Sequence, residues 1–421
     1  MYKETPPTGA ICLRWRADSH NLRFHPRRQD MHWKILTFVL ALSAPLFAQT
    51  PSPASSASPG AKHPFTFEDM MKLKRVGAPV PSPDGKWVVF DAVDVDLEAN
   101  TKISHLWIVP ATGGEARRLN QTPNHEERPR FSPDGTRLIW TSKATDPTQI
   151  WMCNFTPESG GLDGQPRQVT NLSTGADGGI WSPDGKNIVF LSSVYPEAKD
   201  DAENRKRDEE LGKSKVKAKI FTKLLYRHWT SYTEHKRSHL FAVSADAPAE
   251  ARDLTPGDHD VPPFNLGGQD MYSVSPDGQE LAYTSNIDEV EATSTNNEIF
   301  LVPMSGGTPK KISTSPGSDN TPVYSPDGNH IAWRSMARAG FEADKSSLIL
   351  YQRKLGQSRN ATVNFDRSIG SLTWTPDSKG ICFTAEDHGE APIWVLLLDG
   401  KPPKQVSRLH ADDLVFSKDG N

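Results

Sequence analysis

Ser82-Pro83-Asp84-Gly85, followed by Lys86-Trp87-Val88-Val89-Phe90, decides the fold, because copies of it recur along the chain. The tetrapeptide begins again at Ser132, Ser182, Ser275 and Ser325, a degenerate copy begins at Thr375, and a seventh begins at Ser417. Copies from Ser82 to Thr375 start 50 residues apart, except for one interval of 93 residues between Ser182 and Ser275. A fixed period of this length indicates a repeat architecture.

Each copy has the chemistry of a tight turn. Proline presets φ near −65° at the second position, aspartate bonds back to the backbone at the third, and glycine takes the left-handed conformation at no steric cost. This pattern predicts a hairpin whose second strand is the apolar run after the turn. The turn residues are therefore interpreted as structural, and not as a calcium or catalytic carboxylate site: Asp84, Gly85, Asp134, Gly135, Asp184, Gly185, Asp277, Gly278, Asp327 and Gly328.

A second apolar run recurs later in each unit, as in Ser104-His105-Leu106-Trp107-Ile108-Val109, and a glycine-containing turn often follows it. Four short strands per unit of roughly 40–50 residues are typical of a propeller blade. The sequence therefore predicts an all-β fold, a β-propeller of four-stranded antiparallel blades over residues 64–421. We expect six recognisable blades, beginning near residues 76, 126, 176, 269, 319 and 369, and the start of a seventh.

The long interval indicates an insertion between the second and third strands of the third blade, at about residues 193–237. Residues 197–219 are dense in charge, which predicts a solvated helix or a mobile loop and makes the insertion partly helical. Residues 220–229, ending in Tyr226-Arg227-His228-Trp229, are too apolar and aromatic for a loose loop. We expect this second part to dock on the blade surface or on a partner domain.

The N-terminal region has the pattern of an export signal. Residues 31–48 combine a short basic stretch, an apolar run and a small residue before Gln49, which predicts a signal peptide and a periplasmic or secreted protein. The alternative is a retained anchor, but the run is short for a membrane span, so none is expected after cleavage. Residues 1–30 are interpreted as a mis-annotated extension, and residues 49–63 as a flexible linker. The formal net charge of −4 gives no reason to expect a nucleic-acid partner.

Three features together resemble the propeller that precedes the hydrolase domain in the prolyl oligopeptidase family, in its dipeptidyl peptidase and acylaminoacyl peptidase branch. They are the repeat itself, the segment Phe67-Glu68-Asp69-Met70-Met71-Lys72-Leu73-Lys74-Arg75-Val76, and Leu225-Tyr226-Arg227-His228-Trp229 followed by Ser238-His239-Leu240-Phe241. The repeat alone also resembles TolB-like periplasmic propellers. The alternative function is therefore a protein-binding propeller without enzymatic activity.

The family resemblance implies a secreted serine exopeptidase whose activity resides in a C-terminal α/β-hydrolase domain. The family's nucleophile lies in a Gly-x-Ser-x-Gly motif, which does not occur in this sequence, so no catalytic residue is assigned. We expect the chain to be truncated before that domain and inactive alone. Its expected partners are short peptides and the hydrolase domain, and no cofactor or metal is implied.

Two groups of residues in the insertion are candidate contacts with substrate or with the hydrolase domain. Tyr226, Arg227, His228 and Trp229 form the first group. Glu209 and Glu210 form the second, because paired glutamates from a propeller insertion bind the substrate amino group in dipeptidyl peptidases. The aromatic residues that flank that pair in the family are absent here. The sequence leaves open whether the insertion binds substrate or only packs.

Overall fold

The structure, a computed structural model, describes residues 62–233, 235–246, 250–264 and 268–416. The expected signal peptide, the stretch before it and the turn at Ser417 lie outside the described residues. The chain divides into two compact units between residues 71 and 72. Every strand lies in the unit that contains residues 72–421. A short helix, α1 (Phe67–Lys72), lies at the division. It begins with a reciprocal cap, in which the backbone amides of Thr66 and Asp69 donate to each other's side-chain oxygens.

Six antiparallel sheets follow one another along the described residues, and each begins just before one copy of the turn motif. In every sheet the strands are ordered as they occur in the sequence, and in the first sheet the first strand is split into β1 and β2. The strands of the first three sheets are β1 (Arg75–Val76), β2 (Val80–Pro81), β3 (Trp87–Asp96), β4 (Thr101–Pro110) and β5 (Arg117–Arg118); β6 (Glu126–Phe131), β7 (Arg137–Ser142), β8 (Gln149–Thr156) and β9 (Gly161–Gln168); and β10 (Asp177–Trp181), β11 (Asn187–Val194), β14 (Arg237–Ser244) and β15 (Arg252–Asp253).

The strands of the last three sheets are β16 (Tyr272–Val274), β17 (Glu280–Ser285), β18 (Glu298–Pro303) and β19 (Lys310–Lys311); β20 (Asp319–Tyr324), β21 (His330–Ser335), β22 (Ser347–Gln352) and β23 (Gln357–Asn360); and β24 (Leu372–Trp374), β25 (Gly380–Thr384), β26 (Ile393–Leu397) and β27 (Lys404–Gln405). The remaining elements are α2 (Asp201–Lys213), a two-stranded sheet of β12 (Arg227–His228) and β13 (Ser231–Tyr232), and two single 3₁₀ turns, Gln269–Met271 and Glu291–Thr293.

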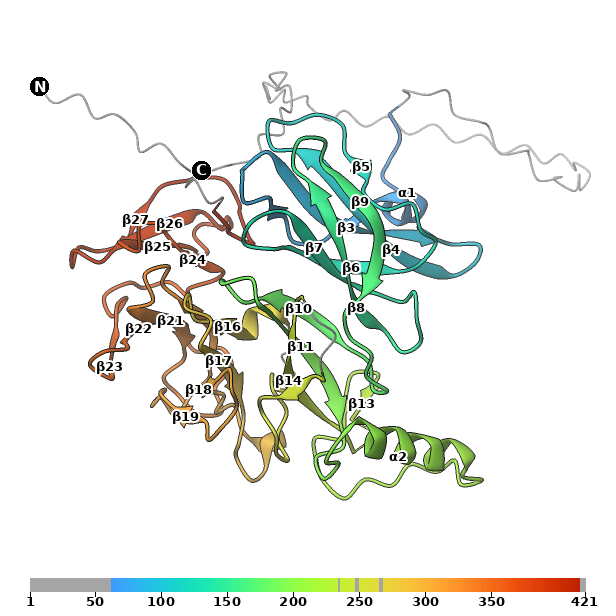
Figure 1. Cartoon of the computed structure of the whole chain (residues 1–421). Coiled ribbons are helices and arrows are strands. Elements are labelled where there is room, and N and C mark those ends of the chain that lie inside the picture. The colour runs from blue at the N-terminus through green and yellow to red at the C-terminus, as the bar shows by residue number, and fades with distance from the viewer. Residues whose placement is uncertain (1–61, 234, 247–249, 265–267, 417–421) are drawn as a thin grey trace, which may run out of the picture. The chain divides into compact units, whose positions relative to one another are not determined.

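First strands pack against neighbouring sheets. Strand β6 contacts β3 and β4, β10 contacts β6 and β7, and β24 contacts β20. Figure 1 shows the sheets following one another in this way, from blue to red. The indole of Trp181 donates to Arg130 O at 3.2 Å, and that of Trp374 donates to Val323 O at 3.0 Å, so equivalent aromatic residues join successive sheets. The predicted fold class, an all-β propeller of antiparallel blades, is confirmed.

The turn motif acts through its side chains as well as its backbone. In the second copy, Gly135 N donates to Ser132 O at 2.8 Å and Gly135 has φ of 73°. Ser132 Oγ donates to Asp134 Oδ1 at 2.5 Å, and Thr136 N donates to the same oxygen at 3.0 Å. Burial opposes ionisation of Asp134, but these hydrogen bonds outweigh it and hold its pKa below the usual value. The Asp134 carboxylate therefore acts as a hydrogen-bond acceptor that stabilises the turn.

A second repeated feature lies four residues before the motif serine. Arg128, Gly178, Thr321 and Asp413 all occupy this position and have φ between 50° and 65°. In β6, β10 and β20 the pairing register shifts at this point, so the first strand carries a bulge there. Asp413, although outside any named strand, thus has the backbone conformation of a first-strand residue.

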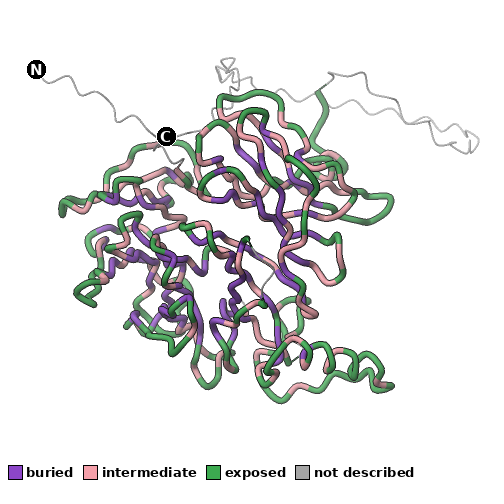
Figure 2. Tube along the Cα trace, in the orientation of Figure 1, coloured by how far each residue is buried: buried purple, intermediate pink, exposed green. Residues whose placement is uncertain are grey.

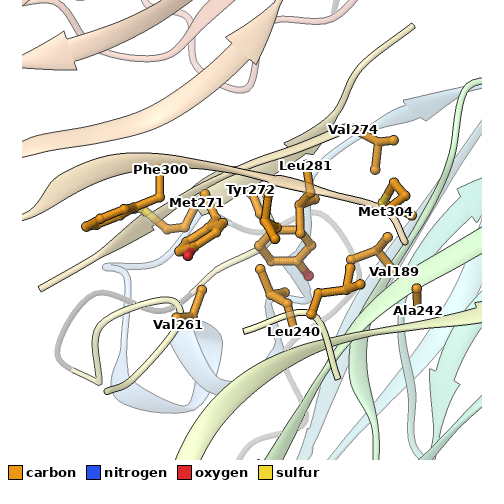
Figure 3. Packing of buried hydrophobic residues seen from close by; sticks show 13 residues of the cluster. Val189, Leu240, Ala242, Val261, Met271, Tyr272, Val274, Leu281, Phe300 and Met304 are labelled. Carbon is orange, nitrogen blue, oxygen red and sulfur yellow. The ribbon is translucent and has the colours of Figure 1, made fainter. Parts of the chain in front are cut away.

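The core lies between the sheets. Leu240 and Val189 of the third sheet pack against Tyr272, Leu281 and other residues of the fourth, as Figure 3 shows. Figure 2 shows the buried residues concentrated on the strands, whereas α2 is mostly exposed. Asn204 is the buried residue of α2. The helix therefore adds little to the core, and most of the apolar burial that stabilises the fold comes from the sheets and the loops between their strands.

Candidate functional site

The segment between β11 and β14 is the largest departure from the repeat, and it contains α2 and the hairpin of β12 and β13. The turn motif at Ser182 precedes β11, and the inserted segment follows Val194 at the opposite end of that strand. The insertion therefore leaves the sheet on the side opposite the turns.

Helix α2 forms where the sequence is rich in charge because its ends are well capped. Asp200 Oδ1 accepts from Glu203 N at 2.9 Å, and Lys213 lies in the last turn. Two contacts attach the helix to the end of β11: Asn204 Oδ1 accepts from Tyr195 N at 2.9 Å, and Asp208 Oδ1 accepts from the Tyr195 hydroxyl at 2.9 Å. Of the two structures predicted for the charged residues 197–219, a solvated helix or a mobile loop, the helix is present over Asp201–Lys213.

Glu209 and Glu210 lie near the end of α2, and both side chains are exposed. Glu209 forms an ion pair with Lys213 at 3.3 Å, one turn along the same helix. Their neighbour Asp208 instead makes contacts between the helix and the rest of the chain, because it accepts from the Tyr195 hydroxyl and pairs with Lys236 at 2.8 Å. The paired glutamates thus lie on the solvent side of α2.

The aromatic part of the insertion folds as a small hairpin. Arg227 pairs with Tyr232 and His228 with Ser231, so Trp229 and Thr230 form the turn, and Trp229 has φ of 47°. A two-residue turn with positive φ suits the twist of a hairpin. Tyr226 and Trp229 are therefore separated by β12 and serve different ends of the hairpin.

Four rings stack at the base of the hairpin. The ring of Phe221 stacks on those of Tyr226, Tyr232 and His235 at centroid distances of 4.8, 5.8 and 5.7 Å. Lys219 Nζ lies 4.7 Å from the centroid of Tyr232. We define Phe221, Tyr226, Tyr232 and His235 as the aromatic stack. Each ring pair contributes roughly 0.5–1.5 kcal/mol beyond its area burial, so the stack holds the hairpin together.

The tip of the hairpin is not covered by the described residues. Trp229 is 85% exposed, and Leu224 is 60% exposed. Arg227 is exposed, whereas His228 is half-buried with its ring 6.1 Å from that of Phe264. The described blade residues thus leave Leu224 and Trp229 uncovered, and the expected docking of this segment, on the blade surface or on a partner domain, stays a prediction.

A polar network lies beneath the hairpin at the start of β14. Arg237 contacts carboxylate oxygens of Asp258, Asp260 and Glu291 at 2.9, 2.8 and 2.7 Å. Burial acts against the charge, but these carboxylates outweigh it and raise the pKa of Arg237. Lys223 also pairs with Asp258 at 2.6 Å, which ties the inserted segment to this network. A cavity of about 210 Å³ lies here, lined by Phe221 and Tyr226 as well as Arg237 and Asp258.

None of the described helices has both the length and the apolar character needed to cross a membrane. Within the described ranges, no group of three or more His, Cys, Asp or Glu side chains is arranged to hold a metal ion.

Comparisons with known proteins identify the relatives of this chain. No family model matches it. A dipeptidyl-peptidase 5 from Porphyromonas gingivalis is 30% identical over 392 residues, which are 92% of this chain and 55% of that protein. The chain is related to the dipeptidyl-peptidase 5 proteins. It spans about half the length of the curated relatives that it matches.

Solved structures agree with the dipeptidyl-peptidase relationship at the level of fold. The Pyrococcus horikoshii acylaminoacyl peptidase has a TM-score of 0.58 at 13% identity, over 80% of this chain and 47% of that chain. The β-propeller domain of the trilobed protease from Pyrococcus furiosus has a TM-score of 0.51 at 13% identity, over 80% of this chain and 86% of that chain. The expected resemblance to the propeller part of the prolyl oligopeptidase family is confirmed.

For this relative of dipeptidyl-peptidase 5, sequence reasoning missed part of the aromatic stack. Tyr232 and His235 were not singled out, although both contact Phe221. The sequence carried no local signal for this hairpin, because its turn residues, Trp229 and Thr230, are not the Asn-Gly or Asp-Gly pairs that mark two-residue turns. The pairing of Arg227 with Tyr232 is visible only in the structure.

Proposed function

We propose that this chain is the non-catalytic propeller of a secreted serine exopeptidase, and that it packs against a hydrolase domain and limits peptide access to it. The kinship with dipeptidyl-peptidase 5 supports the peptidase assignment. The apolar stretch after Met31 supports export.

The observation that carries the contact proposal is the exposure of Trp229 at the tip of the hairpin, with 85% of its surface open. An exposed tryptophan at a hairpin tip, two residues from the exposed Arg227, is typical of an interface centre, where aromatic residues and arginine contribute most of the binding energy. The aromatic stack and the Lys223–Asp258 pair hold the hairpin in place, so little ordering is needed on binding. The hairpin tip is therefore the proposed contact with the hydrolase domain.

Arg227 has a defined role in this proposal. Arg227 is exposed two residues before Trp229, and its guanidinium presents a planar set of donors, which suits a carboxylate of the hydrolase domain or a peptide carbonyl. His228 is half-buried beneath the tip and supports Trp229 through a ring contact at 5.7 Å. Glu209 and Glu210 have a lesser claim, since Glu209 already pairs with Lys213.

The test expresses the longest protein that contains this chain, with and without the double substitution Arg227→Ala/Trp229→Ala, which leaves the aromatic stack intact. Val363, another apolar side chain with 67% of its surface exposed, gives the matched control Val363→Ala. We expect kcat/KM for dipeptidyl chromogenic substrates to fall in the double variant while Tm changes little, and both to be unchanged in the control.

Two outcomes would contradict the proposal. If kcat/KM is unchanged in the double variant, the hairpin has no part in catalysis. If the longest protein has no serine-inhibitor-sensitive peptidase activity but captures an envelope protein, the TolB-like alternative holds instead.

A further inference from the structure

A cavity of about 630 Å³ lies at the turn side of the first three sheets, at the opposite end of β11 from the hairpin. Its wall is largely apolar and includes Pro83, Pro133 and Pro183, the prolines of three successive turn motifs, and Phe416. Two charged side chains, Arg130 and Asp413, also line it. The size is within the range of small-molecule sites, about 300–1,000 Å³.

Arg130 enters this cavity from β6 without a carboxylate partner. Its Nη1 donates to Pro129 O at 2.8 Å and its Nη2 to Gln269 Oε1 at 2.7 Å, and both acceptors are neutral. Gln269 is itself held, because its Nε2 donates to Gly179 O at 3.0 Å. Among the described residues no Asp or Glu oxygen lies within 4.0 Å of this guanidinium, which has five N–H groups to offer.

Arg128, two residues earlier on the same strand, differs from Arg130 because it has a carboxylate partner. Arg128 Nη1 lies 2.7 Å from Asp177 Oδ2. Burial lowers the pKa of Arg130, whereas the more distant charges of Asp91 and Asp413 act in the opposite direction. A half-buried guanidinium with only neutral acceptors can still gain a charged hydrogen-bond partner from a bound carboxylate.

Asp413 is the complementary group. Its backbone has the φ of 50° that recurs at the bulge of the first strands, so the local geometry sets the position of its side chain. Among the described residues no Lys, Arg or His nitrogen lies within 4.0 Å of its carboxylate. The Arg130 guanidinium also lies beyond this distance. Asp413 is exposed, but partial burial still raises its pKa, and the neighbouring carboxylates of Asp412 and Asp270 add to this effect. A bound cation would relieve both penalties.

We propose that this cavity binds a small zwitterion of the amino-acid or dipeptide class, with its carboxylate on Arg130, its ammonium on Asp413 and its side chain against the prolines and Phe416. An anion alone would be repelled by Asp413, and a cation alone by Arg130. A ligand that carries both charges, held apart by a short backbone, satisfies each group. This site does not depend on the proposed peptidase function and lies on the other side of the sheet from the hairpin.

The test measures binding to the full chain by calorimetry, using Ala-Ala and two blocked analogues. N-acetyl-Ala-Ala lacks the ammonium, and Ala-Ala amide lacks the carboxylate. We expect Ala-Ala to bind and each analogue to bind at least about tenfold more weakly. Arg130→Gln and Asp413→Asn should each weaken Ala-Ala binding by a similar factor, while Arg359→Gln, an exposed arginine on β23, should not.

Circular dichroism and Tm establish that each variant is folded before its affinity is compared, and the near-isosteric Asp413→Asn keeps the test valid if Arg130→Gln unfolds the chain. Equal binding of either blocked analogue would overturn the proposal, because one charge would then be irrelevant. Absence of Ala-Ala binding, or binding that is unchanged in both variants, would overturn it as well. None of these outcomes bears on the hydrolase contact, which is measured through turnover.

Discussion

Trp140 Nε1 donates a hydrogen bond of 2.9 Å to Glu126 Oε1, and the side chains of both residues are buried. The fifth sheet repeats the arrangement, since Trp333 Nε1 donates to Asp319 Oδ1 at 2.7 Å. In both pairs the acid lies on the first strand and the indole on the second. The second carboxylate oxygen, Glu126 Oε2 or Asp319 Oδ2, has no hydrogen-bond partner among the described residues. Each of these sheets thus buries an acid that is only half satisfied.

The first prediction follows from that half-satisfied acid. Burial raises the pKa of Glu126 to about 7, against 4.5 ordinarily. Between these values the folded state holds a proton that the unfolded state has released, so the free energy of unfolding falls as pH rises across this window. Glu126→Gln cannot ionise, so its free energy of unfolding should not fall across this window. The glutamine oxygen can still accept the hydrogen bond from Trp140 Nε1. We expect its Tm relative to the parent to be higher by a few degrees at pH 8 and nearly equal at pH 4.

Asp319→Asn provides the parallel case, because burial raises the pKa of Asp319 to about 6. The gain in Tm of Asp319→Asn over the parent should develop across a narrower and lower range of pH than that of Glu126→Gln. A difference in Tm that is the same at pH 4 and pH 8 for both variants would show that these acids do not titrate on unfolding.

The second prediction concerns the turn motif. Gly135 has φ of 73°, and a Cβ placed there would lie 3.3 Å from Cδ of Pro83. Gly135→Ala should therefore lower the free energy of unfolding by roughly 1–2 kcal/mol, the cost of a left-handed non-glycine residue. Chemical denaturation measures this value.

Gly212 offers the matched control, because it lies in α2 and a Cβ there would meet no atom of the described residues within 4 Å. Gly212→Ala should be neutral or stabilise by about 0.5–1 kcal/mol, as glycine is a poor helix former. Equal destabilisation by the two changes would contradict the role assigned to the turn.

The third prediction separates the tip of the hairpin from its base. Trp229→Ala should change the free energy of unfolding by no more than about 0.5 kcal/mol, because the side chain is 85% exposed. Phe221→Ala removes the ring on which Tyr226, Tyr232 and His235 stack. Hydrogen exchange should then show faster exchange of the hairpin amides in the Phe221 variant only. Similar exchange in both variants would mean that the stack does not hold the hairpin.

The fourth prediction tests the network under the hairpin. Arg237→Gln leaves Asp260, which is 3% exposed, without its cationic partner, and it also removes the cation beside Glu291. Breaking a buried pair in this way costs about 3–5 kcal/mol. Denaturant melts should show a loss of this size.

Arg205→Gln is the comparison, because Arg205 pairs with Asp201 at 3.3 Å on the exposed face of α2. Such surface pairs contribute at most about 0.5 kcal/mol. If Arg237→Gln lowers the free energy of unfolding no more than Arg205→Gln does, water must solvate the carboxylates in place of the Arg237 guanidinium.

Much of the fold was predictable because its signals are local. Turn chemistry depends on four adjacent residues, so the copies at Ser82, Ser132 and Ser325 could be recognised wherever they occur. Strand periodicity and the 50-residue spacing then indicated sheets of four strands. The first strand β6 begins at Glu126, where the spacing placed the start of the second blade.

The candidate sites were less predictable, because they depend on contacts between distant parts of the chain. The sequence singled out Tyr226 and Trp229 for their aromatic character, but only the folded hairpin leaves Trp229 exposed and stacks Tyr226 on Phe221. Arg130 and Asp413 line one cavity although they are far apart in the sequence. Local rules specify how a strand turns and which face it buries. Which charges are left without a partner depends on how neighbouring sheets pack, and only the tertiary structure decides that.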